Sequence, residues 1–356
     1  MIKSFEVKNL NNKISDKFYF NEDLNILTGK NGCGKTTIMK TIWYLVSGNL
    51  DKIFEEVYFD FARVEMNNGS FIQLEVKNVK KKNTRKIIIT FNKEDESYMQ
   101  EIEIPFENYE QIPSIFTSES SLFFPTFRRI EGGFSITTNR RFRRNALRDS
   151  LESISENLTN GFNHKFIASI STEDINYLLS NKYADISEEI RKLEVNQSSK
   201  ILGIVASSED KEKESLELIR NLVKDNDKKR NDILKPFTML SLVVHRIFKD
   251  KSIKISNNLE LGEAKDAIFS DKLSAGEKQM LSFLCYNFFY DNSVIFIDEP
   301  ELSLHTDWQR ILFPTLLKQK KNNQFIIATH SPFIYAKYTD KEIIINEDKG
   351  TANGEQ

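Results

Sequence analysis

One stretch decides the fold of this 356-residue chain: Gly29-Lys30-Asn31-Gly32-Cys33-Gly34-Lys35-Thr36-Thr37. It fits the pattern GxxxxGK(S/T), follows an apolar run at residues 24–27 and opens a segment with helical spacing at residues 34–47. Glycines let backbone N–H groups converge on phosphate oxygens, and the dipole at a helix N-terminus favours an anion. A strand, a glycine turn and a helix in this order therefore predict a phosphate-binding loop.

The side chains of this loop suit a nucleoside triphosphate, and we expect ATP. The ammonium of Lys35 would neutralise the β- and γ-phosphates, and the hydroxyl of Thr36 would be a ligand of Mg2+. The residues expected to bind the nucleotide here are Asn31, Gly32, Cys33, Gly34, Lys35, Thr36 and Thr37.

A pair of carboxylates, Asp298 and Glu299, follows a second apolar run at residues 294–297. Seen alone, such a pair could be two exposed loop acids after a core strand. Together with the phosphate loop it is better explained as a site, because ligands bind at the carboxyl ends of parallel strands. We expect Asp298 to hold Mg2+ and Glu299 to orient and deprotonate the attacking water. The sequence therefore predicts an enzyme that hydrolyses ATP to ADP and phosphate.

The remaining pattern predicts an α/β fold. Apolar and polar residues alternate in residues 1–28 and 54–104, which indicates strands, the second set antiparallel. Strands alternate with helices towards the C-terminus, which indicates a parallel sheet. The expected parts are the N-terminal half of an ATPase head with the phosphate loop and an antiparallel β subdomain (1–139), a helical insertion (140–261), the C-terminal half of the head (262–346) and a flexible tail (347–356). Within the insertion we expect helices at 184–206 and 209–234. Within the C-terminal half we expect helices at 276–290 and 304–319 and strands at 293–298, 324–328 and 342–346.

A further helix is expected to begin in Leu273-Ser274-Ala275-Gly276-Glu277-Lys278-Gln279, where Ser274 is a natural N-cap. Its place shortly before the acidic strand end makes the chain resemble the ABC ATPase superfamily, whose signature has the form LSGGQ. Ala275 and Glu277 depart from that form. The resemblance implies an ABC-type head whose Ser274, Gly276 and Glu277 contact the ATP bound to another copy. It also implies a head-to-tail homodimer, or a higher even-numbered homo-oligomer, around the nucleotides.

Two more segments fit this resemblance. His330, in Ala328-Thr329-His330-Ser331-Pro332, follows an expected strand and resembles the switch histidine that senses the γ-phosphate. We therefore expect His330 to be catalytic beside Glu299. Residues 301–305 lie where the superfamily has its D-loop, with His305 in place of the usual aspartate. The glutamine that completes the magnesium shell in the superfamily is not assigned, and Gln73 and Gln111 are its candidates.

The chain most resembles the branch that contains SMC, RecF-like and OLD-family ATPases. Residues 123–131, FFPTFRRIE, are similar to a segment of small ATPases from bacterial antiphage systems, of the PtuA and retron-associated kind. In those systems the ATPase commonly assembles with a separate toxic effector, often a nuclease. The resemblance implies an ATPase that regulates such an effector. The alternative is a RecF- or SMC-like DNA-repair ATPase that acts directly on DNA.

Seven arginines lie within 21 residues that contain one acid. Arginine forks suit phosphates and carboxylates, so the block is a candidate contact with a DNA or RNA backbone, or with an acidic partner protein. The third explanation is a solvated face or ion pairs within the chain. Charge patterning leaves the three open. The arginines are Arg128, Arg129, Arg140, Arg141, Arg143, Arg144 and Arg148.

Composition narrows the class of protein. The net charge is −2, so any nucleic-acid contact must come from a local patch. The two cysteines, Cys33 and Cys285, form no CxxC pair, which argues against a zinc site and favours reduced thiols in a cytoplasmic protein. The N-terminus has no apolar signal core, and polar residues interrupt the longest apolar stretch at residues 280–297. We therefore expect no membrane segment.

Overall fold

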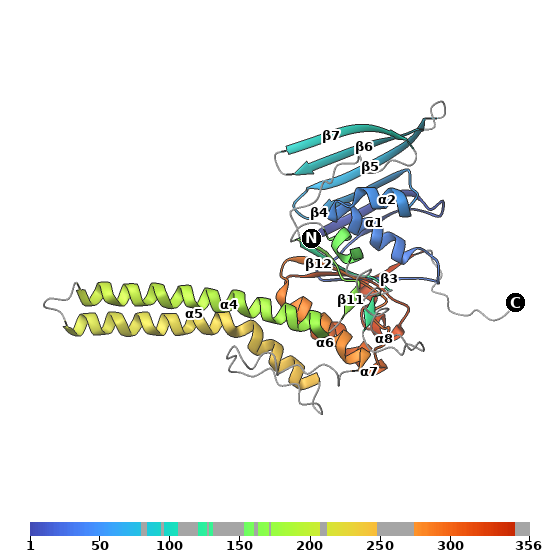
Figure 1. The fold of residues 1–356 in the computed structure, drawn as a ribbon. Coiled ribbons are helices and arrows are strands. Elements are labelled where there is room, and N and C mark those ends of the chain that lie inside the picture. The colour runs from blue at the N-terminus through green and yellow to red at the C-terminus, as the bar shows by residue number, and fades with distance from the viewer. Residues whose placement is uncertain are drawn as a thin grey trace, which may run out of the picture. The chain divides into compact units, whose positions relative to one another are not determined.

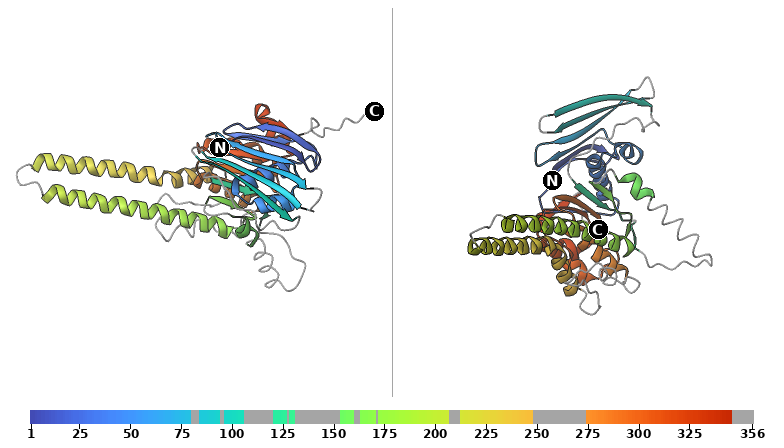
Figure 2. Two further views of the ribbon diagram at one scale, coloured as in Figure 1. Left: turned by 90° about the horizontal axis from the view of Figure 1, so that it is seen from above. Right: turned by 60° about the vertical axis from the view of Figure 1, so that its left-hand side comes forward.

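The computed structural model describes residues 1–79, 84–93, 96–105, 120–126, 128–130, 153–159, 163–170, 172–206, 212–247 and 274–345. The chain divides into two compact units. The first holds Met1–Ile170 and Tyr290–Gln356, and the second holds Ser171–Phe289. Figures 1 and 2 show the elements of both.

The first unit contains an antiparallel sheet of six strands in the order β2-β1-β4-β5-β6-β7. Burial alternates along its strands, as in β4, because one face of each strand meets the core. The tight turn between β4 and β5 has Gly69 at φ 84°, as the Asn-Asn-Gly signal predicted. The turn predicted near Asn83 lies outside the described residues. The strands are β1 (Ile2–Leu10), β2 (Ile14–Tyr19), β4 (Phe61–Met66), β5 (Phe71–Val79), β6 (Thr84–Lys93) and β7 (Glu96–Pro105).

A second sheet of the same unit is parallel, with the strand order β10-β8-β12-β13-β3-β14. Every residue of β3, β12 and β13 is buried, which explains their continuous apolar runs. Asp298 pairs with Ala328, Ala328 pairs with Leu27, and Ile297 pairs with Phe124, so the carboxyl ends of four strands line up at one edge. The strands are β3 (Leu24–Thr28), β8 (Ser120–Phe124), β10 (His164–Phe166), β12 (Ser293–Asp298), β13 (Gln324–Ala328) and β14 (Glu342–Ile344), and a separate parallel pair joins β9 (Arg129–Ile130) to β11 (Ser169–Ile170).

Helix α1 (Lys35–Ser47) contacts strands of both sheets (Figure 1), and it is buried along almost its whole length. Its Trp43 is fully buried, and its ring lies 5.5 Å from that of Phe123 and 5.4 Å from that of Phe166. The indole N–H donates to the hydroxyl of Ser121 at 3.1 Å, so the one polar atom of the ring is satisfied in the core. The helix ends at Gly48, which takes the left-handed conformation expected of a C-cap.

The first unit departs from prediction just after α1. Residues 54–59 were expected to begin the antiparallel strands, but α2 (Leu50–Glu56) ends there and the next strand begins only at Phe61. Ile53 and Phe54 are buried, and the N–H of Val57 closes the helix by donating to the carbonyl of Ile53 at 2.8 Å. A short apolar run is compatible with a buried helix as well as with a strand, and here it forms a helix. The unit also holds α7 (Thr306–Lys318), α8 (Pro332–Tyr335) and the short turn η3 (Thr339–Lys341).

The second unit is helical. Helices α4 (Thr172–Ala206) and α5 (Glu212–Ile247) run side by side (Figure 2), and α6 (Ala275–Phe289) packs against both. The ring of Phe237 lies 5.9 Å from that of Tyr183 and 5.1 Å from that of Phe289, so one aromatic residue joins the three helices. Most other residues of α4 and α5 are exposed, as the dense charge of these segments predicted.

The packing of α6 divides the chain differently from the predicted parts. The insertion was placed at residues 140–261 and α6 with the C-terminal half of the head, whereas the second unit runs from Ser171 to Phe289. The physical reason is that the apolar side chains of α6 meet those of α4 and α5. Among the described residues, no helix is both long and apolar enough to cross a membrane.

Candidate functional site

The loop between β3 and α1 places three glycines at positive φ, where a residue with a side chain would be strained. Gly29, Gly32 and Gly34 have φ values of 145°, 75° and 101°. A Cβ on Gly29 would lie 2.6 Å from the carbonyl oxygen of Ile345, and one on Gly34 would lie 2.7 Å from Cδ1 of Ile14. The glycines therefore allow both the left-handed conformation and the close approach of neighbouring strands.

Lys35 opens α1 and turns its side chain back over the loop. Its ammonium donates to the carbonyl oxygens of Gly29 at 3.0 Å and Lys30 at 3.1 Å, and it lies 3.8 Å from the Cys33 sulfur. The side chain is only 6% exposed. A buried positive charge thus sits within the loop, where a phosphate would be neutralised.

Thr36 and Asp298 meet although 262 residues separate them along the chain. The hydroxyl of Thr36 donates to the Asp298 carboxylate at 2.9 Å, with the second oxygen at 3.1 Å. Asp298 is the last residue of β12 and is 1% exposed. The structure therefore brings together the two residues that the sequence proposed as magnesium ligands.

Thr126 brings a third side chain with oxygen atoms to the contact between Thr36 and Asp298, and the sequence analysis did not predict it. It follows β8, two residues beyond Phe124, and its hydroxyl donates to the same Asp298 carboxylate. The available signal was a hydroxyl just after a buried strand whose end lies beside that of β12. Gln73 instead bonds to Arg63 and Glu75 on β4 and β5, and Gln111 lies outside the described residues. Neither glutamine candidate is therefore placed at the Thr36–Asp298 contact by the described residues.

The donors fit a magnesium ion. Mg2+ prefers oxygen ligands and commonly uses one or two protein groups, with water and substrate phosphates supplying the rest. Asp298 and Thr36 offer that kind of set. The part of the chain that the structure describes contains no group of three or more His, Cys, Asp or Glu side chains that could enclose a metal by themselves.

Glu299 follows directly and has an unusual backbone, with φ at 48°. Its N–H donates to the carbonyl of Ala328 at 2.8 Å, which fastens it to the end of β13. Burial, followed by the negative charges of Asp298 and Glu301, raises the pKa of the Glu299 carboxyl, against the opposing charges of His330 and Lys35. A raised pKa makes this carboxylate a better proton acceptor than an ordinary glutamate.

The segment after β13 is tied to the segment after Glu299. The carboxylate of Glu301 accepts hydrogen bonds from the Thr329 hydroxyl and from the backbone N–H of His330, both at 2.8 Å. The His330 side chain itself is exposed. Nearby, the Ser331 hydroxyl donates to the Gln309 side chain at 2.5 Å, and the Gln309 amide donates to the carbonyl of Leu304 at 2.8 Å. The backbone of His330 is therefore fixed by a hydrogen bond, whereas its imidazole ring is exposed.

His305 has a structural role in this segment. Its Nδ1 accepts from the N–H of Asp307 at 3.4 Å, so the imidazole caps the start of α7. Ser, Thr, Asn and Asp usually take such positions, and here the histidine supplies the acceptor.

Ser274, Gly276 and Glu277 belong to the second unit, at the start of α6. The Ser274 N–H and hydroxyl donate to the Glu277 carboxylate at 2.7 and 2.8 Å, and the Glu277 N–H returns a bond to the hydroxyl at 3.4 Å. This reciprocal arrangement is a capping box. Glu277, a departure from the superfamily signature, thus stabilises the helix that presents Ser274.

The arginine block is only partly described. Arg140, Arg141, Arg143, Arg144 and Arg148 lie outside the described residues, as does the side chain of Arg129. Arg128 is 6% exposed, and its guanidinium donates to backbone carbonyls inside the first unit. Of the three explanations left open for the block, Arg128 thus fits contacts within the chain, and the contact of the block with nucleic acid or an acidic partner stays a prediction. Charge density along a sequence does not reveal which arginine the fold buries.

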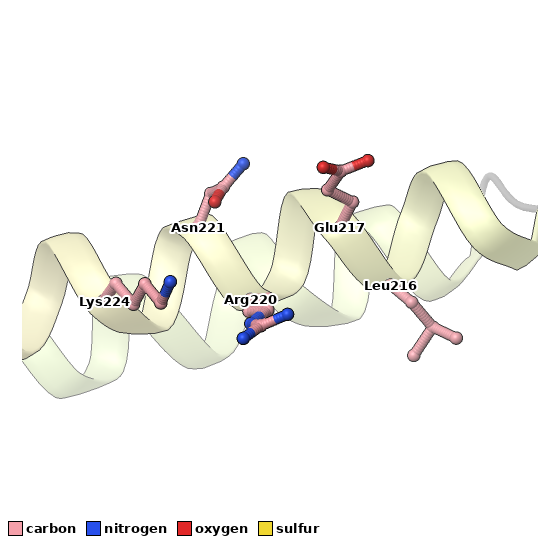
Figure 3. Close-up of a pocket in the computed structure, with 5 residues that line it drawn as sticks. All are labelled: Leu216, Glu217, Arg220, Asn221 and Lys224. Carbon is pink, nitrogen blue, oxygen red and sulfur yellow. The ribbon is translucent and has the colours of Figure 1, made fainter.

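A hollow of about 360 Å³ lies on α5, lined by Leu216, Glu217, Arg220, Asn221 and Lys224 (Figure 3). All five residues come from consecutive turns of one helix. No second element in that set encloses a ligand, so the hollow is a groove between side chains on a helix surface.

Comparisons with known proteins find one family match and several similar proteins. A profile of the family described as "AAA domain, putative AbiEii toxin, Type IV TA system" matches residues 24–336. The "Retron Vc95 probable ATPase" of Vibrio cholerae serotype O1 biovar El Tor is 24% identical in an alignment of 367 positions, which covers 90% of this chain and 68% of that protein. The "Septu protein PtuA" of Bacillus thuringiensis is 36% identical over 73 residues, which is 20% of this chain and only 18% of that protein.

Among solved structures, the Smc head domain of Pyrococcus furiosus bound to the C-terminal domain of ScpA covers 94% of this chain. The match covers 91% of that chain, at 16% identity and a TM-score of 0.38.

Proposed function

This chain belongs to the AAA-domain family just described, a family of ATPases, and we propose that it binds Mg-ATP and hydrolyses it with Glu299 as the catalytic base. The other roles follow the geometry. Asn31 to Thr37 surround the phosphates, with Lys35 as their positive charge. Thr36 and Asp298 hold the magnesium ion, and His330 faces the γ-phosphate.

The observation that carries this proposal is the contact of Thr36 with Asp298. Two motifs from opposite ends of the chain meet at 2.9 Å, at the edge where four parallel strands end. A phosphate loop whose first helical hydroxyl touches a buried carboxylate has the parts needed to hold a nucleotide through its metal. Chance matches to either motif would not explain their meeting.

In the proposed reaction a water molecule attacks the γ-phosphorus of ATP. The bond from that phosphorus to the β–γ bridging oxygen breaks, and ADP leaves with the electron pair. The proton of the water passes to the Glu299 carboxylate, whose raised pKa suits it to accept one. Bound magnesium supplies charge neutralisation on the phosphate oxygens. Lys35 and the backbone N–H groups of its loop stabilise the charge that develops.

We further propose that two copies complete each site. Ser274, Gly276 and Glu277 would reach the γ-phosphate bound to another protomer, giving a head-to-tail dimer or a higher even-numbered oligomer. What supports this is the exposed Ser274 at the N-terminus of α6, where backbone N–H groups and the helix dipole favour an anion. Association driven by ATP and reversed by hydrolysis would be a two-state element.

This element would regulate a separate effector, and we propose a nuclease in bacterial antiphage defence. The support is similarity to proteins named as a retron ATPase and a Septu protein. The alternative, an ATPase that repairs DNA directly, predicts ATP-stimulated DNA binding without any protein partner. Purification of the chain from its native cell distinguishes the two: a co-purifying nuclease supports defence, and DNA alone supports repair.

The first test is a Glu299→Gln variant incubated with ATP and magnesium, followed by sizing chromatography with light scattering. This substitution keeps the shape of the side chain but removes the base. We expect undiminished ATP binding, no phosphate release and a stable ATP-dependent dimer. Lys35→Ala is the control, because it should lose nucleotide binding and remain unassociated. A Glu299→Gln protein that hydrolyses ATP at the wild-type rate would contradict the assignment of the base.

A further inference from the structure

Arg128 lies on the segment after β8, and its side chain contacts the backbone at the carboxyl end of β12. Its guanidinium donates through Nη1 to the carbonyls of Asp298 at 2.6 Å and Pro125 at 2.9 Å, and through Nη2 to that of Glu299 at 2.9 Å. A planar fork suits two neighbouring carbonyl oxygens, because its N–H groups point in fixed and parallel directions. One side chain thus grips two consecutive peptide groups of the catalytic segment.

The residue that Arg128 grips has a backbone that needs support. The φ of Glu299 is 48°, in the left-handed region that residues with a side chain rarely adopt. Such a conformation persists only where its surroundings fix it. The N–H of Glu299 is held by the carbonyl of Ala328 and its own carbonyl by Arg128, so the peptide groups on both sides of its Cα are anchored.

Burial also fits Arg128 for this task and excludes a role at the surface. The side chain is 6% exposed, and burial lowers its pKa to about 10, while the charges of Asp298, Glu301 and Glu299 oppose that change. The guanidinium therefore remains charged at neutral pH. Its hydrogen bonds are made to backbone carbonyls of its own unit.

We propose that Arg128 is a positioning residue that fixes the left-handed backbone of Glu299 and, through it, the direction in which the catalytic carboxylate points. In this proposal Arg128 acts on Glu299 through hydrogen bonds to main-chain carbonyls and not through the substrate. Because the peptide groups on both sides of the Glu299 Cα are fixed, the direction in which its side chain starts is fixed as well. The inference rests on the proposed role of Glu299 in ATP hydrolysis.

The test is an Arg128→Ala variant with steady-state ATPase kinetics and nucleotide affinity measured on the whole chain. We expect kcat to fall by about tenfold or more, whereas KM and the dissociation constant for nucleotide change by less than about threefold. The phosphate loop, which sets affinity, makes its contacts without Arg128. Added guanidinium chloride at low concentration should restore part of kcat, because the free ion can occupy the space that the substitution leaves.

Arg63→Ala is the matched control. Arg63 lies on β4 in the same unit, where its guanidinium bonds to Gln73 at 3.2 Å and stacks over Phe71 at 3.9 Å. Its removal should leave kcat unchanged, and guanidinium chloride should give this variant no gain in rate. The control separates the effect of the added ion from its action as a mild denaturant.

Arg128→Lys keeps the positive charge but cannot donate to both carbonyls as a fork, and it serves if the alanine variant does not fold. We expect its kcat to fall while its Tm stays close to that of the wild type. A wild-type kcat in either variant, or a fall that guanidinium never relieves and that follows the loss of Tm, would overturn the inference. Failure of the proposed function would look different, because the unmodified chain would then release no phosphate.

Discussion

The carboxylate of Glu301 lies 2.8 Å from the backbone nitrogen of His330 and accepts its hydrogen. The same carboxylate accepts the hydroxyl of Thr329 at 2.8 Å, so one side chain holds two consecutive residues of the segment after β13. Glu301 belongs to the segment that follows Glu299, the proposed catalytic base. The position of His330, the proposed switch histidine, is therefore coupled to that segment.

Glu301→Ala should release this coupling. The half-buried hydroxyl of Thr329 and the exposed N–H of His330 would lose a charged acceptor, and we expect the free energy of unfolding to fall by about 2 kcal/mol. The rate of ATP hydrolysis should fall as well, because His330 would no longer be fixed. Thermal melting and phosphate release measure the two effects.

The control is Glu65→Ala, which removes only a salt bridge to Lys3 on the antiparallel sheet. Such a partly exposed pair contributes less than about 1 kcal/mol, and kcat should be unchanged. If Glu301→Ala behaved like this control in both measurements, the hydrogen bonds of Glu301 to Thr329 and His330 would contribute neither to stability nor to the rate.

Thr126→Val should weaken the response to magnesium. The substitution keeps the size of the side chain and removes the hydroxyl that donates to Asp298. Partners that orient a metal ligand commonly account for tenfold or more in metal affinity, so the Mg2+ concentration for half-maximal rate should rise by about tenfold. A magnesium titration of ATPase activity checks this.

The control is Thr238→Val on α5, where the hydroxyl only returns to the carbonyl of Leu234 at 3.4 Å. Its magnesium titration should match the wild type. An unshifted titration for Thr126→Val would remove Thr126 from the site.

Glu299→Gln should make the first unit more stable at neutral pH. The pKa of Glu299 is raised, mainly by burial, so the folded state binds a proton more tightly than the unfolded state does. The carboxylate therefore lowers stability as pH rises from its ordinary pKa of 4.5 through the raised value, and glutamine removes that loss. We expect a higher Tm than the wild type at neutral pH and a difference that vanishes below pH 4.5. A Tm difference that is independent of pH would show that charge is not its cause.

The same raised pKa predicts the acid side of the rate profile. A base must be unprotonated to accept the proton of water, so the ATPase rate should fall at a higher pH than an ordinary glutamate would give. The measurement is kcat against pH at saturating ATP. A rate that stays constant down to the ordinary pKa would argue against Glu299 as the base.

Ser274→Ala should separate two roles of the serine. The loss of an N-cap costs about 1 kcal/mol of helix stability, and it should lower the Tm slightly. The loss of the proposed contact with the γ-phosphate should abolish ATP-dependent association altogether. Ser198→Ala is the control, because Ser198 lies on α4 and its hydroxyl only returns to the carbonyl of Glu194 at 3.0 Å. Normal association by the Ser274→Ala protein would contradict the shared site.

Much of the site was predictable because its parts are local motifs. Gly29 to Thr37 carries the spacing of a phosphate loop, and the apolar run before Asp298 marks a buried strand. The parallel register then brings these segments to one edge, which the alternation of strands and helices already indicated. The capping role of Ser274 followed from the preference of serine for helix starts.

The parts that escaped prediction depend on tertiary contacts. Thr126 carries no pattern of its own, and its contact with Asp298 arises only when β8 pairs with β12. Arg128 was grouped with the neighbouring arginines, because a sequence does not show which arginine donates to backbone carbonyls in the folded chain. Helix α4 begins at Thr172, earlier than the expected residue 184. Ile175 and Leu179 are buried and Tyr183 contacts Phe237 of α5, so tertiary packing stabilises the part of the helix before residue 184.

The central claim is that the phosphate loop of one protomer works with the Ser274 helix of another. Mixing a Lys35→Ala protein with a Ser274→Ala protein tests it most directly. In a mixed dimer one site combines both defects, while the other joins an intact loop from the serine variant to an intact Ser274 helix from the lysine variant. We predict that each variant alone is inactive and that the mixture regains ATPase activity, up to about a quarter of the wild-type rate for random pairing of two-site dimers. A mixture as inactive as its components would contradict the account.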